Sequence, residues 1–504
     1  MLVALAAARS AQGSPIDDPH VGGIGFAGPT SDDLSALYWN PAAIGLGNGR
    51  RAMISLIDHT GTLEVQRASI DPATGQPGEG RSFPATKGQF GGLRSPVGPG
   101  SFVALALPVG SRVTLALGWF WPFVQRQQFD PISPISPISP ISPLSSPAPA
   151  ADPVNQPTRY HALTTELTTL AISPAISALL GAGVRIGLAP ALQISSGSLV
   201  IDRDTGTPSG SVGATRLCGA APCGAENPGA AARYDIGSGR AISFSLAVGV
   251  HLNRPRWSLG VSWTSSPFGT REGIEIEAES TRIDPPPRLS GGAALCPGGL
   301  DPCVSSRMVF HLPMMVTAGV DRHMTARWDI GLQARWLDLS VHDTVAVRVV
   351  GPAGGTLRSA GLPEELLLHR GLQDVLDLRL RSVIRLGERI DIAATLRGET
   401  ASVSDQSMSP GALGGRLIEP SLAIRARVTT WLVVTGGYAI SFMPWVNAAT
   451  SVFDPGANAA CEATGGHLDA EPCQKRQNGT AGPTAAGRYR AHTHGFGLSA
   501  TAAF

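Results

Sequence analysis

Residues 242–253 read ISFSLAVGVHLN, and this stretch determines the fold that we predict. Large apolar side chains occupy the even positions from Ile242 to Leu252, whereas small or polar side chains occupy the odd positions from Ser243 to Asn253. A period of two is the pattern of a β-strand, because successive side chains point to opposite faces of the strand. The stretch therefore predicts a strand with one apolar face and one polar face.

The same alternation recurs along the chain. In residues 257–264, 328–336 and 421–428, tryptophan, leucine and other apolar residues share one face, and serine, glutamine, aspartate or arginine share the other. Residues 172–194 could pass for a membrane helix, but their alternation is strict and Gly181–Gly183 interrupt it, so we expect two strands joined by a turn. The chain ends in a further amphipathic strand that closes on Phe504, as outer-membrane barrels characteristically do. These patterns predict an all-β protein.

Strand length and spacing distinguish a soluble β-sandwich from a membrane barrel, since both alternate. The alternating segments run about 9–13 residues, close to the length that crosses a bilayer at a tilt. Short links at 253–255 and 323–326 alternate with long polar insertions near 203–238, 284–304, 352–368 and 446–486. Short turns at one rim and long loops at the other predict a transmembrane antiparallel β-barrel. Tryptophans near strand ends or on apolar faces would form its interfacial girdle, at positions 119, 121, 257, 263, 328, 336, 431 and 445.

The composition of the 504-residue chain fits this class. Only 15% of residues are charged, yet there is no uncharged apolar run long enough for a membrane helix. A formal net charge of +1 gives no electrostatic case for binding nucleic acid. The sequence contains no HExxH or G-x-S-x-G motif. We therefore expect a protein that is not an enzyme and that holds neither a cofactor nor a metal.

Three other features concern the parts of the chain between strands. Residues 1–11 resemble the apolar part of a secretory signal followed by small residues, although without the usual basic start. Residues 131–158 contain a proline-rich run that predicts an extended surface loop, because proline cannot donate ladder hydrogen bonds. The six cysteines form close pairs in segments rich in glycine, proline and alanine, and short-range disulfides explain them better than a zinc site does. These pairs are Cys218 with Cys223, Cys296 with Cys303, and Cys461 with Cys473.

Residues 31–42, SDDLSALYWNPA, predict the one helical element. A serine or aspartate caps about two apolar turns, and Pro41 disfavours helix at Asn40. Together with the preceding GGIG at 22–25, this stretch resembles the amino-terminal signature of the FadL/TodX-type outer-membrane transporters of long-chain fatty acids and aromatic hydrocarbons. Further stretches are similar to elements of that family in the same order: 118–123, 165–175, 260–268 and 312–336.

The resemblance implies a barrel of 14 strands over residues 51–504, blocked by an amino-terminal hatch over residues 12–50 that contains the helix. It also implies that a hydrophobic ligand enters from the outer face and leaves sideways through a gap in the barrel wall when the hatch shifts. Our strand count of about 14–16 agrees with an even-stranded bacterial barrel. The hatch residues that the resemblance singles out are Asp32, Asp33, Asn40, Pro41 and Ala42.

Location and partners follow from the same resemblance. We expect a multi-pass protein of the outer membrane of a Gram-negative bacterium, a monomer surrounded by outer-membrane lipids. Its terminal strand at Phe504 would be recognised by the barrel-assembly machinery. Passive uptake of hydrophobic small molecules is the expected function, with fatty acids ranked before aromatic hydrocarbons. The alternatives are an aqueous porin, an adhesive barrel and, more remotely, a soluble β-sandwich enzyme.

Charged residues on the polar faces of the strands are the remaining candidate sites. Arginine and aspartate inside a barrel usually pair across the lumen and hold a plug or set the polarity of the pore. Alternatively, one arginine meets a ligand carboxylate through a charge-assisted hydrogen bond. The candidates are Asp329, Arg335, Asp391, Arg397, Arg425 and Arg427.

Overall fold

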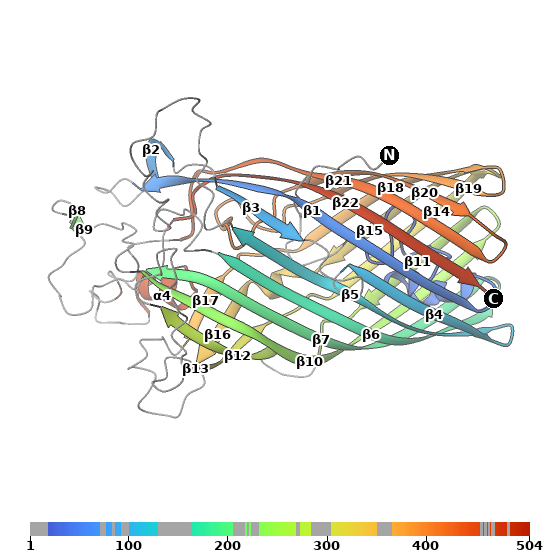
Figure 1. Cartoon of the computed structure of the whole chain (residues 1–504), viewed down its shortest axis with the longest axis horizontal. Helices are drawn as coiled ribbons and strands as arrows, with labels where there is room; N and C mark the ends of the chain where they lie inside the picture. Colours follow the sequence, from blue (N-terminus) through green and yellow to red (C-terminus); the bar gives the residue numbers. More distant parts are fainter. Residues whose placement is uncertain are drawn as a thin grey trace, which may run out of the picture.

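The alternating segments pair in chain order into one antiparallel sheet that closes on itself (Figure 1). In this computed structural model, β1 (Arg51–Ile70) pairs with β22 (Gly487–Ala503), from Arg51 opposite Ala503 to Arg67 opposite Gly487. The closed barrel has 14 strands, which confirms the predicted fold class. The structure describes residues 19–70, 77–82, 86–91, 100–129, 161, 163–204, 217–218, 221–222, 231–268, 273–283, 304–349, 365–453, 457, 461, 464, 469–480 and 484–504.

Several wall strands consist of two consecutive elements, because a short break divides their membrane part from their outer part. Between β1 and β22 the wall runs in order through β3 (Thr86–Gly91) with β4 (Ser101–Val109), β5 (Val113–Phe129), β6 (Thr164–Gly181), β7 (Val184–Asp204), β10 (Ala231–Arg254), β11 (Trp257–Thr264) with β12 (Ile274–Ile283), β14 (Met315–Thr325) with β13 (Val304–Phe310), β15 (Trp328–Leu337) with β16 (Thr344–Val349), β18 (Val375–Leu386) with β17 (Glu365–His369), β19 (Ile390–Glu399), β20 (Leu417–Arg427) and β21 (Leu432–Ala448).

The remaining elements lie outside this wall sequence or connect its strands. The hairpin β8 (Leu217–Cys218) and β9 (Ala221–Pro222) forms a separate small sheet, and β2 (Pro77–Ser82) pairs with the end of β1. The helical elements are α1 (Ala36–Trp39), η1 (Pro41–Leu46), η4 (Leu339–His342) and α4 (Glu471–Gln477). None of the helices within the described part of the chain is both long and apolar enough to cross a membrane.

The two faces of the strands are oriented as the alternation predicts. On β10 the side chains of Ile242, Phe244 and Val250 are 67%, 50% and 50% exposed, whereas those of Ser243 and Ser245 are buried. At about 3.3 Å per residue and a tilt of about 40°, residues 242–252 rise roughly 25 Å along the barrel axis, the height of the apolar band of such barrels. The apolar face therefore covers the outside of the barrel.

Strands such as β14, β18 and β19 have the predicted 9–13 residues, whereas others are longer, and β10 has 24. The first ten of them, AARYDIGSGR, show no alternation, yet they still pair with β7 and β12. A strand beyond the lipid has no need for an outward apolar row, so its sequence loses the signal while its backbone remains paired. The predicted insertion 203–238 was wrong in this respect, and the insertions 352–368 and 446–486 likewise overlap β17 and β21.

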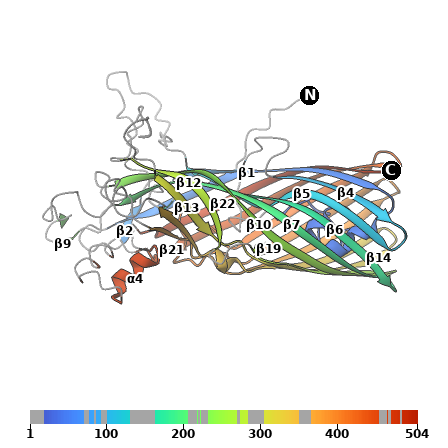
Figure 2. The same ribbon diagram turned by 90° about the horizontal axis from the view of Figure 1, so that it is seen from below.

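Long and short connections separate at the two rims, as predicted (Figures 1 and 2). Turns such as 255–256 and 326–327 gather at one end, which we call the short-turn rim. The opposite, long-loop rim carries α4 and the Cys461–Cys473 disulfide, the predicted bond that the structure describes. The predictions for Cys218–Cys223, Cys296–Cys303, the signal at 1–11 and the proline-rich loop at 131–158 fall outside the described residues.

The turn between β6 and β7 shows why glycine stands at this rim. Ala182 has a φ of 47° and Gly183 a φ of 76°, both in the left-handed region that a tight turn requires. A Cβ atom on Gly183 would lie 2.3 Å from the carbonyl oxygen of Asn253 on the adjacent strand. The predicted division of residues 172–194 into two strands is thus confirmed.

Candidate functional site

The amino-terminal segment lies inside the barrel near the short-turn rim (Figures 1 and 2). We call its described residues, 19–48, the hatch segment. It contains less helix than predicted: α1 makes a single turn, and η1 follows as a 3₁₀ helix. Asn40 between them is extended, with φ −165° and ψ 100°, so Pro41 breaks the helix where expected and then starts the second one. The two predicted apolar turns are therefore one α-turn and one 3₁₀ segment.

Asn40 holds this break in place with its side chain, which is fully buried. Its Oδ1 accepts a hydrogen bond from the backbone N–H of Ala42 at 3.1 Å and so caps η1. Its Nδ2 donates to the carbonyl oxygens of Pro29 at 3.0 Å and of Val250 on β10 at 3.1 Å. One side chain thus joins two parts of the hatch segment to the barrel wall.

Ala42 fits a wall position that has no side chain. A Cβ atom on Gly187 of β7 would lie 2.1 Å from the backbone nitrogen of Ala42, so only glycine allows this approach. The carbonyl oxygen of Ala42 accepts a hydrogen bond from Ser177 Oγ on β6 at 2.7 Å. The 3₁₀ segment is therefore seated directly against β6 and β7.

Trp39 is the buried anchor of the hatch segment. Its indole N–H donates to the carbonyl oxygen of Val21 at 2.9 Å. Its own carbonyl oxygen accepts hydrogen bonds from wall residues Ser262 at 2.5 Å and Thr317 at 2.9 Å. The guanidinium carbons of Arg335 and Arg379 lie 5.6 and 5.4 Å from the indole centroid, within the range of cation–π attraction.

The two hatch aspartates meet one wall arginine. Arg425 Nη2 lies 3.1 Å from Asp33 Oδ2, and its Nη1 lies 3.7 Å from the more exposed Asp32. Arg51, at the start of β1, donates to the carbonyl oxygens of Asp32 and Ile44 at 2.8 and 2.5 Å. Arginines on two strands of the wall, β1 and β20, thus hold this part of the hatch segment.

A buried charge network on β15, β18, β19 and β20 lies behind Trp39. Asp377 is its centre, with Arg397 Nε at 2.8 Å and Arg335 Nη2 at 3.0 Å. Arg397 also contacts Glu399 and lies 3.3 Å from Glu419. Each of these five side chains is no more than 5% exposed, and such a network is stable only if every charge is paired.

This network and its neighbours reach the hatch segment directly. Glu419 Oε1 lies 3.1 Å from Nε2 of His20 on the hatch segment. Arg379 donates to the carbonyl oxygen of Pro19 at 3.1 Å, and Arg381 donates to that of Phe26 at 2.7 Å. Arg381 is itself paired with Asp321 at 2.7 Å. The β14–β20 side of the lumen therefore holds the hatch segment through charged and hydrogen-bonding groups.

The predicted lumen charges divide into two groups. Arg335, Arg397 and Arg425 belong to the contacts just described. Asp329 instead pairs with Arg385 near the short-turn rim, Asp391 is half-buried on β19, and Arg427 is exposed and donates to the carbonyl oxygen of Glu388 at 3.1 Å. The sequence analysis missed Asp377, Arg379 and Arg381, although they alternate with leucines in 375–381, VLDLRLR, by the same rule.

The opposite side of the hatch segment is aromatic and apolar. Tyr38 packs edge-on against Phe120 of β5 at 5.4 Å between ring centroids, and Phe120 stacks on Phe102 of β4 at 5.8 Å. Above these rings lies a cavity of about 540 Å³, which we call the inner cavity. Its lining includes Leu37, Tyr38, Phe120, Pro122, Ala171 and Met315. The hatch segment forms the floor of this cavity.

The wall beside the inner cavity contains a β-bulge. Phe120 of β5 pairs with Ala171 of β6, and Phe123 pairs with Thr169. Between these two pairs β5 advances by three residues and β6 by only two. The extra residue falls at 121–122, where proline cannot donate a ladder hydrogen bond. On the other side of β5, no residue of the described parts of β3 and β4 pairs with positions 121–126. Pairing between the described wall strands is therefore irregular next to the inner cavity.

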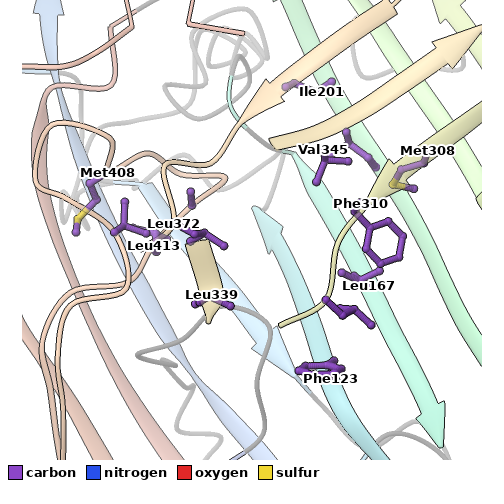
Figure 3. Close-up of a cluster of buried hydrophobic side chains, with 14 of the residues drawn as sticks. Phe123, Leu167, Ile201, Met308, Phe310, Leu339, Val345, Leu372, Met408 and Leu413 are labelled. Atoms are coloured by element: carbon purple, nitrogen blue, oxygen red, sulfur yellow. The ribbon is translucent and has the colours of Figure 1, made fainter. Parts of the chain in front are cut away.

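A second cavity, of about 680 Å³, lies toward the long-loop rim, and we call it the outer cavity. Its apolar lining belongs to the buried cluster in Figure 3, where Leu167, Ile201, Met308, Phe310 and Val345 lie close together. The lining on β6 and β7 continues that of the inner cavity, from Leu167 to Ala171 and from Leu199 to Gln193. Two apolar cavities therefore follow one another along the lumen.

Arg370 is the charged group in the lining of the outer cavity. Its side chain is only 6% exposed, and burial lowers its pKa to about 10, so it remains a cation at neutral pH. It donates to the carbonyl oxygen of Gly411 at 3.2 Å, while its Nε has no hydrogen-bond partner among the described residues. No carboxylate of the described chain forms an ion pair with it.

The neighbour of Arg370 is a neutral histidine. His342 Nδ1 donates to the carbonyl oxygen of His311 at 2.5 Å, which leaves its Nε2 to accept from Arg370 Nη1 at 3.4 Å. Burial and the Arg370 cation lower the pKa of His342 to about 3. Elsewhere in the lining, Glu166 is paired with Arg126, and His369, whose pKa burial lowers, lies 3.7 Å from Asp343. Among the described residues, Arg370 is thus a buried cation without a counter-charge.

Side chains that bind metals do not cluster in the described part of the chain. Within the described ranges, no group of three or more histidine, cysteine, aspartate or glutamate side chains could hold a metal ion. The lumen instead offers two apolar cavities, one uncompensated cation and a tightly held floor. These features suit the binding of an apolar or amphipathic molecule.

The architecture is similar to that of several solved structures. The chain is similar to a FadL homologue of Pseudomonas aeruginosa, with a TM-score of 0.66, 16% identity, and 99% of this chain and 100% of that chain covered. It is also similar to the toluene transporters TodX of Pseudomonas putida (TM-score 0.58, 14% identity, 98% and 100% covered) and TbuX of Ralstonia pickettii (TM-score 0.55, 13% identity, 97% and 98% covered). No protein-family model matches the sequence, and no curated protein matches it.

The class that the fold defines is the closed, 14-stranded antiparallel β-barrel with a small amino-terminal helical segment. Within that class, the chain has the fold of the FadL/TodX-type transporters, as the sequence resemblance predicted.

Proposed function

We propose that this protein carries hydrophobic small molecules passively across an outer membrane. The observation that carries the proposal is the pair of apolar cavities in series, with the inner one closed below by the hatch segment. The similar structures include a FadL homologue and two toluene transporters, which supports transport of a hydrophobic compound by this chain too. Ligand would enter at the long-loop rim, bind in the outer cavity and pass to the inner one.

The bulge in β5 is where we propose that the ligand leaves. It borders the inner cavity through Phe120 and Pro122, so a ligand there lies next to an irregularly paired part of the wall. A lateral exit lets an apolar molecule reach lipid without entering water, whereas a path through the hatch segment would cross the buried charges behind Trp39. Movement of Tyr38 and Leu37 on the aromatic side would open this route while the charged side stays in place.

Among the two ligand classes, the outer cavity favours an amphipathic carboxylate over a neutral hydrocarbon. A buried guanidinium without a counter-charge is unfavourable, and a ligand carboxylate would pair with Arg370 while its chain occupies the apolar lining. Fatty acids therefore rank first and aromatic hydrocarbons second.

The test of gating is an uptake measurement on an Asn40→Ala variant. The substitution removes the cap of η1 and the bonds to Pro29 and Val250, so the hatch segment loses its defined position against β10. We expect uptake of radiolabelled oleate by cells to fall several-fold below the wild-type rate, because each lost hydrogen bond costs about 1 kcal/mol and three act together. The amount of barrel in the membrane should be unchanged.

Asn253→Ala is the matched control, since Asn253 is exposed near the end of β10 and its side chain has no described contact with the hatch segment. Membrane insertion of every variant is checked by the heat-dependent mobility of the folded barrel. Identical uptake by wild type and Asn40→Ala, at equal amounts of barrel, would remove the hatch from the mechanism.

A further inference from the structure

The short-turn rim carries a strong excess of positive charge. Eight exposed arginines lie in its turns or at the adjoining strand ends, and the exposed acidic residues described there are Asp32 and Glu388. The exposed charged side chains described at this rim therefore sum to +6, whereas the whole chain carries only +1. The arginines are Arg50, Arg112, Arg254, Arg256, Arg322, Arg327, Arg389 and Arg427.

These arginines stand at the edge of the lipid-facing band. Trp257, Trp328 and Trp431 at the same rim are 36%, 39% and 54% exposed, and the outward residue after Trp257, Leu259, is 39% exposed. Exposed tryptophans mark the level of the lipid headgroups in membrane proteins. The guanidinium groups beside them are therefore at the height of headgroup phosphates, and long arginine side chains readily extend to that level.

The strand register places two of the arginines on either side of one tryptophan. Arg254 of β10 is opposite Trp257 of β11, and Trp257 is opposite Arg322 of β14. Opposite residues on neighbouring antiparallel strands share a face, and all three side chains are exposed on the outside of the barrel. With strands about 4.8 Å apart, the two arginine backbones lie about 10 Å apart, a gap that two long side chains can close around one phosphate.

The guanidinium groups of this row have no partner in the described chain. Neither Arg254 nor Arg322 forms an ion pair or a side-chain hydrogen bond with any described residue. At the long-loop rim the comparable outward arginines differ: Arg490 lies 2.6 Å from Glu64, and Arg488 and Arg490 stack on Trp445 at 5.0 and 4.7 Å. The charges of Arg254 and Arg322 are thus left for an external anion.

We propose that Arg254, Trp257 and Arg322 form a binding site for the phosphate group of an anionic phospholipid in the adjacent leaflet. The inference rests on the proposed placement in an outer membrane. Guanidinium groups bind phosphate through paired, charge-assisted hydrogen bonds, and the indole packs beside the glycerol region. Because the row faces outward, its occupant lies in the bilayer, which favours a lipid over a soluble acidic protein below the rim.

The test is native mass spectrometry of the detergent-purified barrel titrated with dioleoylphosphatidylglycerol or, as the zwitterionic comparison, dioleoylphosphatidylcholine. Wild type should retain phosphatidylglycerol preferentially. The Arg254→Gln/Arg322→Gln variant should bind its first phosphatidylglycerol about tenfold more weakly, since charge-assisted hydrogen bonds are lost. Arg254→Lys/Arg322→Lys keeps the positive charges but lacks the forked donors of the guanidinium groups. Its affinity for phosphatidylglycerol should lie between those of wild type and the double-glutamine variant.

Arg488→Gln/Arg490→Gln removes the same number of charges at the other rim and should leave the affinity unchanged. The proposal is overturned if wild type retains both lipids equally, or if the two double-glutamine variants lose phosphatidylglycerol to the same extent. Folding of each variant is verified by heat-dependent mobility. Lipid retention is an equilibrium measurement that needs no transport, so its outcome is separate from that of the uptake experiment.

Discussion

Arg370 is the residue on which the proposed class of ligand depends. A buried arginine in a protein interior is normally matched by a carboxylate, as Arg397 is by Asp377, Glu399 and Glu419. Arg370 instead has a neutral histidine and a carbonyl oxygen as partners. Its charge is therefore available to a ligand that brings its own anion into the outer cavity.

Replacing Arg370 by glutamine should separate charged from neutral ligands. We expect the Kd for oleate to rise about 10- to 100-fold, because a hydrogen bond to a charged group is worth roughly 1.5–3 kcal/mol. The Kd for oleyl alcohol, which has the same chain without the carboxylate, should change little. Both constants can be measured by displacement of a fluorescent fatty acid from the purified barrel.

Arg348→Gln is the control for this experiment. Arg348 lies on β16 near the same rim, but its exposed side chain is paired with Glu365 at 2.8 Å. Surface pairs of this kind contribute little, so the control should bind oleate like wild type. Equal weakening of oleate and oleyl alcohol by Arg370→Gln would show that the arginine shapes the cavity without recognising the carboxylate.

At this same scale, the sequence predicted some residues of the site and missed others. The break at Asn40 and Pro41 was predictable because proline restricts its predecessor through local sterics alone. The bonds from Asn40 to Val250 join positions 210 residues apart, and no local pattern contains them. Arg370 lies between two strands without alternation around it, so nothing in the sequence distinguished it from a solvated charge.

Strand β5 illustrates the scale of a single element. A proline in a wall strand removes one donor, and the bulge at 121–122 displaces the pairing by one residue. Both effects weaken the contact with neighbouring strands at the height of the inner cavity. Bulges frequently lie next to functional sites, where they redirect side chains or end pairing.

Deleting Trp121 and replacing Pro122 by threonine should restore regular pairing between β5 and β6. We expect uptake of oleate to fall strongly while the Kd for oleate stays near that of wild type, because the cavity persists and only its exit is sealed. Trp121→Phe keeps the bulge and should behave as wild type in both measurements. Undiminished uptake by the deletion variant would place the exit elsewhere.

The elements were predictable only where lipid imposes a pattern. Residues 242–252 alternate because one face contacts hydrocarbon, and the strand was recognised from that. Residues 231–238 of the same strand stand beyond the lipid and were assigned to a loop. The register of each pair, and hence the Arg254–Trp257–Arg322 row, depends on how neighbouring strands align, which the alternation of a single strand does not determine.

On the scale of the whole molecule, the lumen has two unlike sides. Charged and hydrogen-bonding groups on β14–β20 hold the hatch segment, and aromatic side chains on β4 and β5 pack against its other face. Directional bonds between buried charges are costly to break, whereas apolar contacts allow sliding. We infer that the charged side is fixed and that any movement occurs on the aromatic side.

This arrangement predicts electrical behaviour that separates a transporter from a porin. The hatch segment is buried almost throughout between His20 and Gly45, so the intact barrel should show no steady ion current in a planar bilayer. A variant lacking residues 19–48 should conduct steadily, because the lumen of a 14-stranded barrel is then open to water. A steady current through the intact protein would favour the porin alternative.

The position of the hatch segment also has a consequence for the order of biogenesis. It precedes β1 in the chain, yet it is enclosed by a wall that is completed only when β22 pairs with β1. Several of its polar partners, including Asp321, Arg381 and Glu419, are synthesised hundreds of residues later. The segment therefore cannot reach its final contacts before most of the sheet exists. The wall therefore has to assemble around the hatch segment, and the final pairing of β22 with β1 both closes the barrel and encloses the segment.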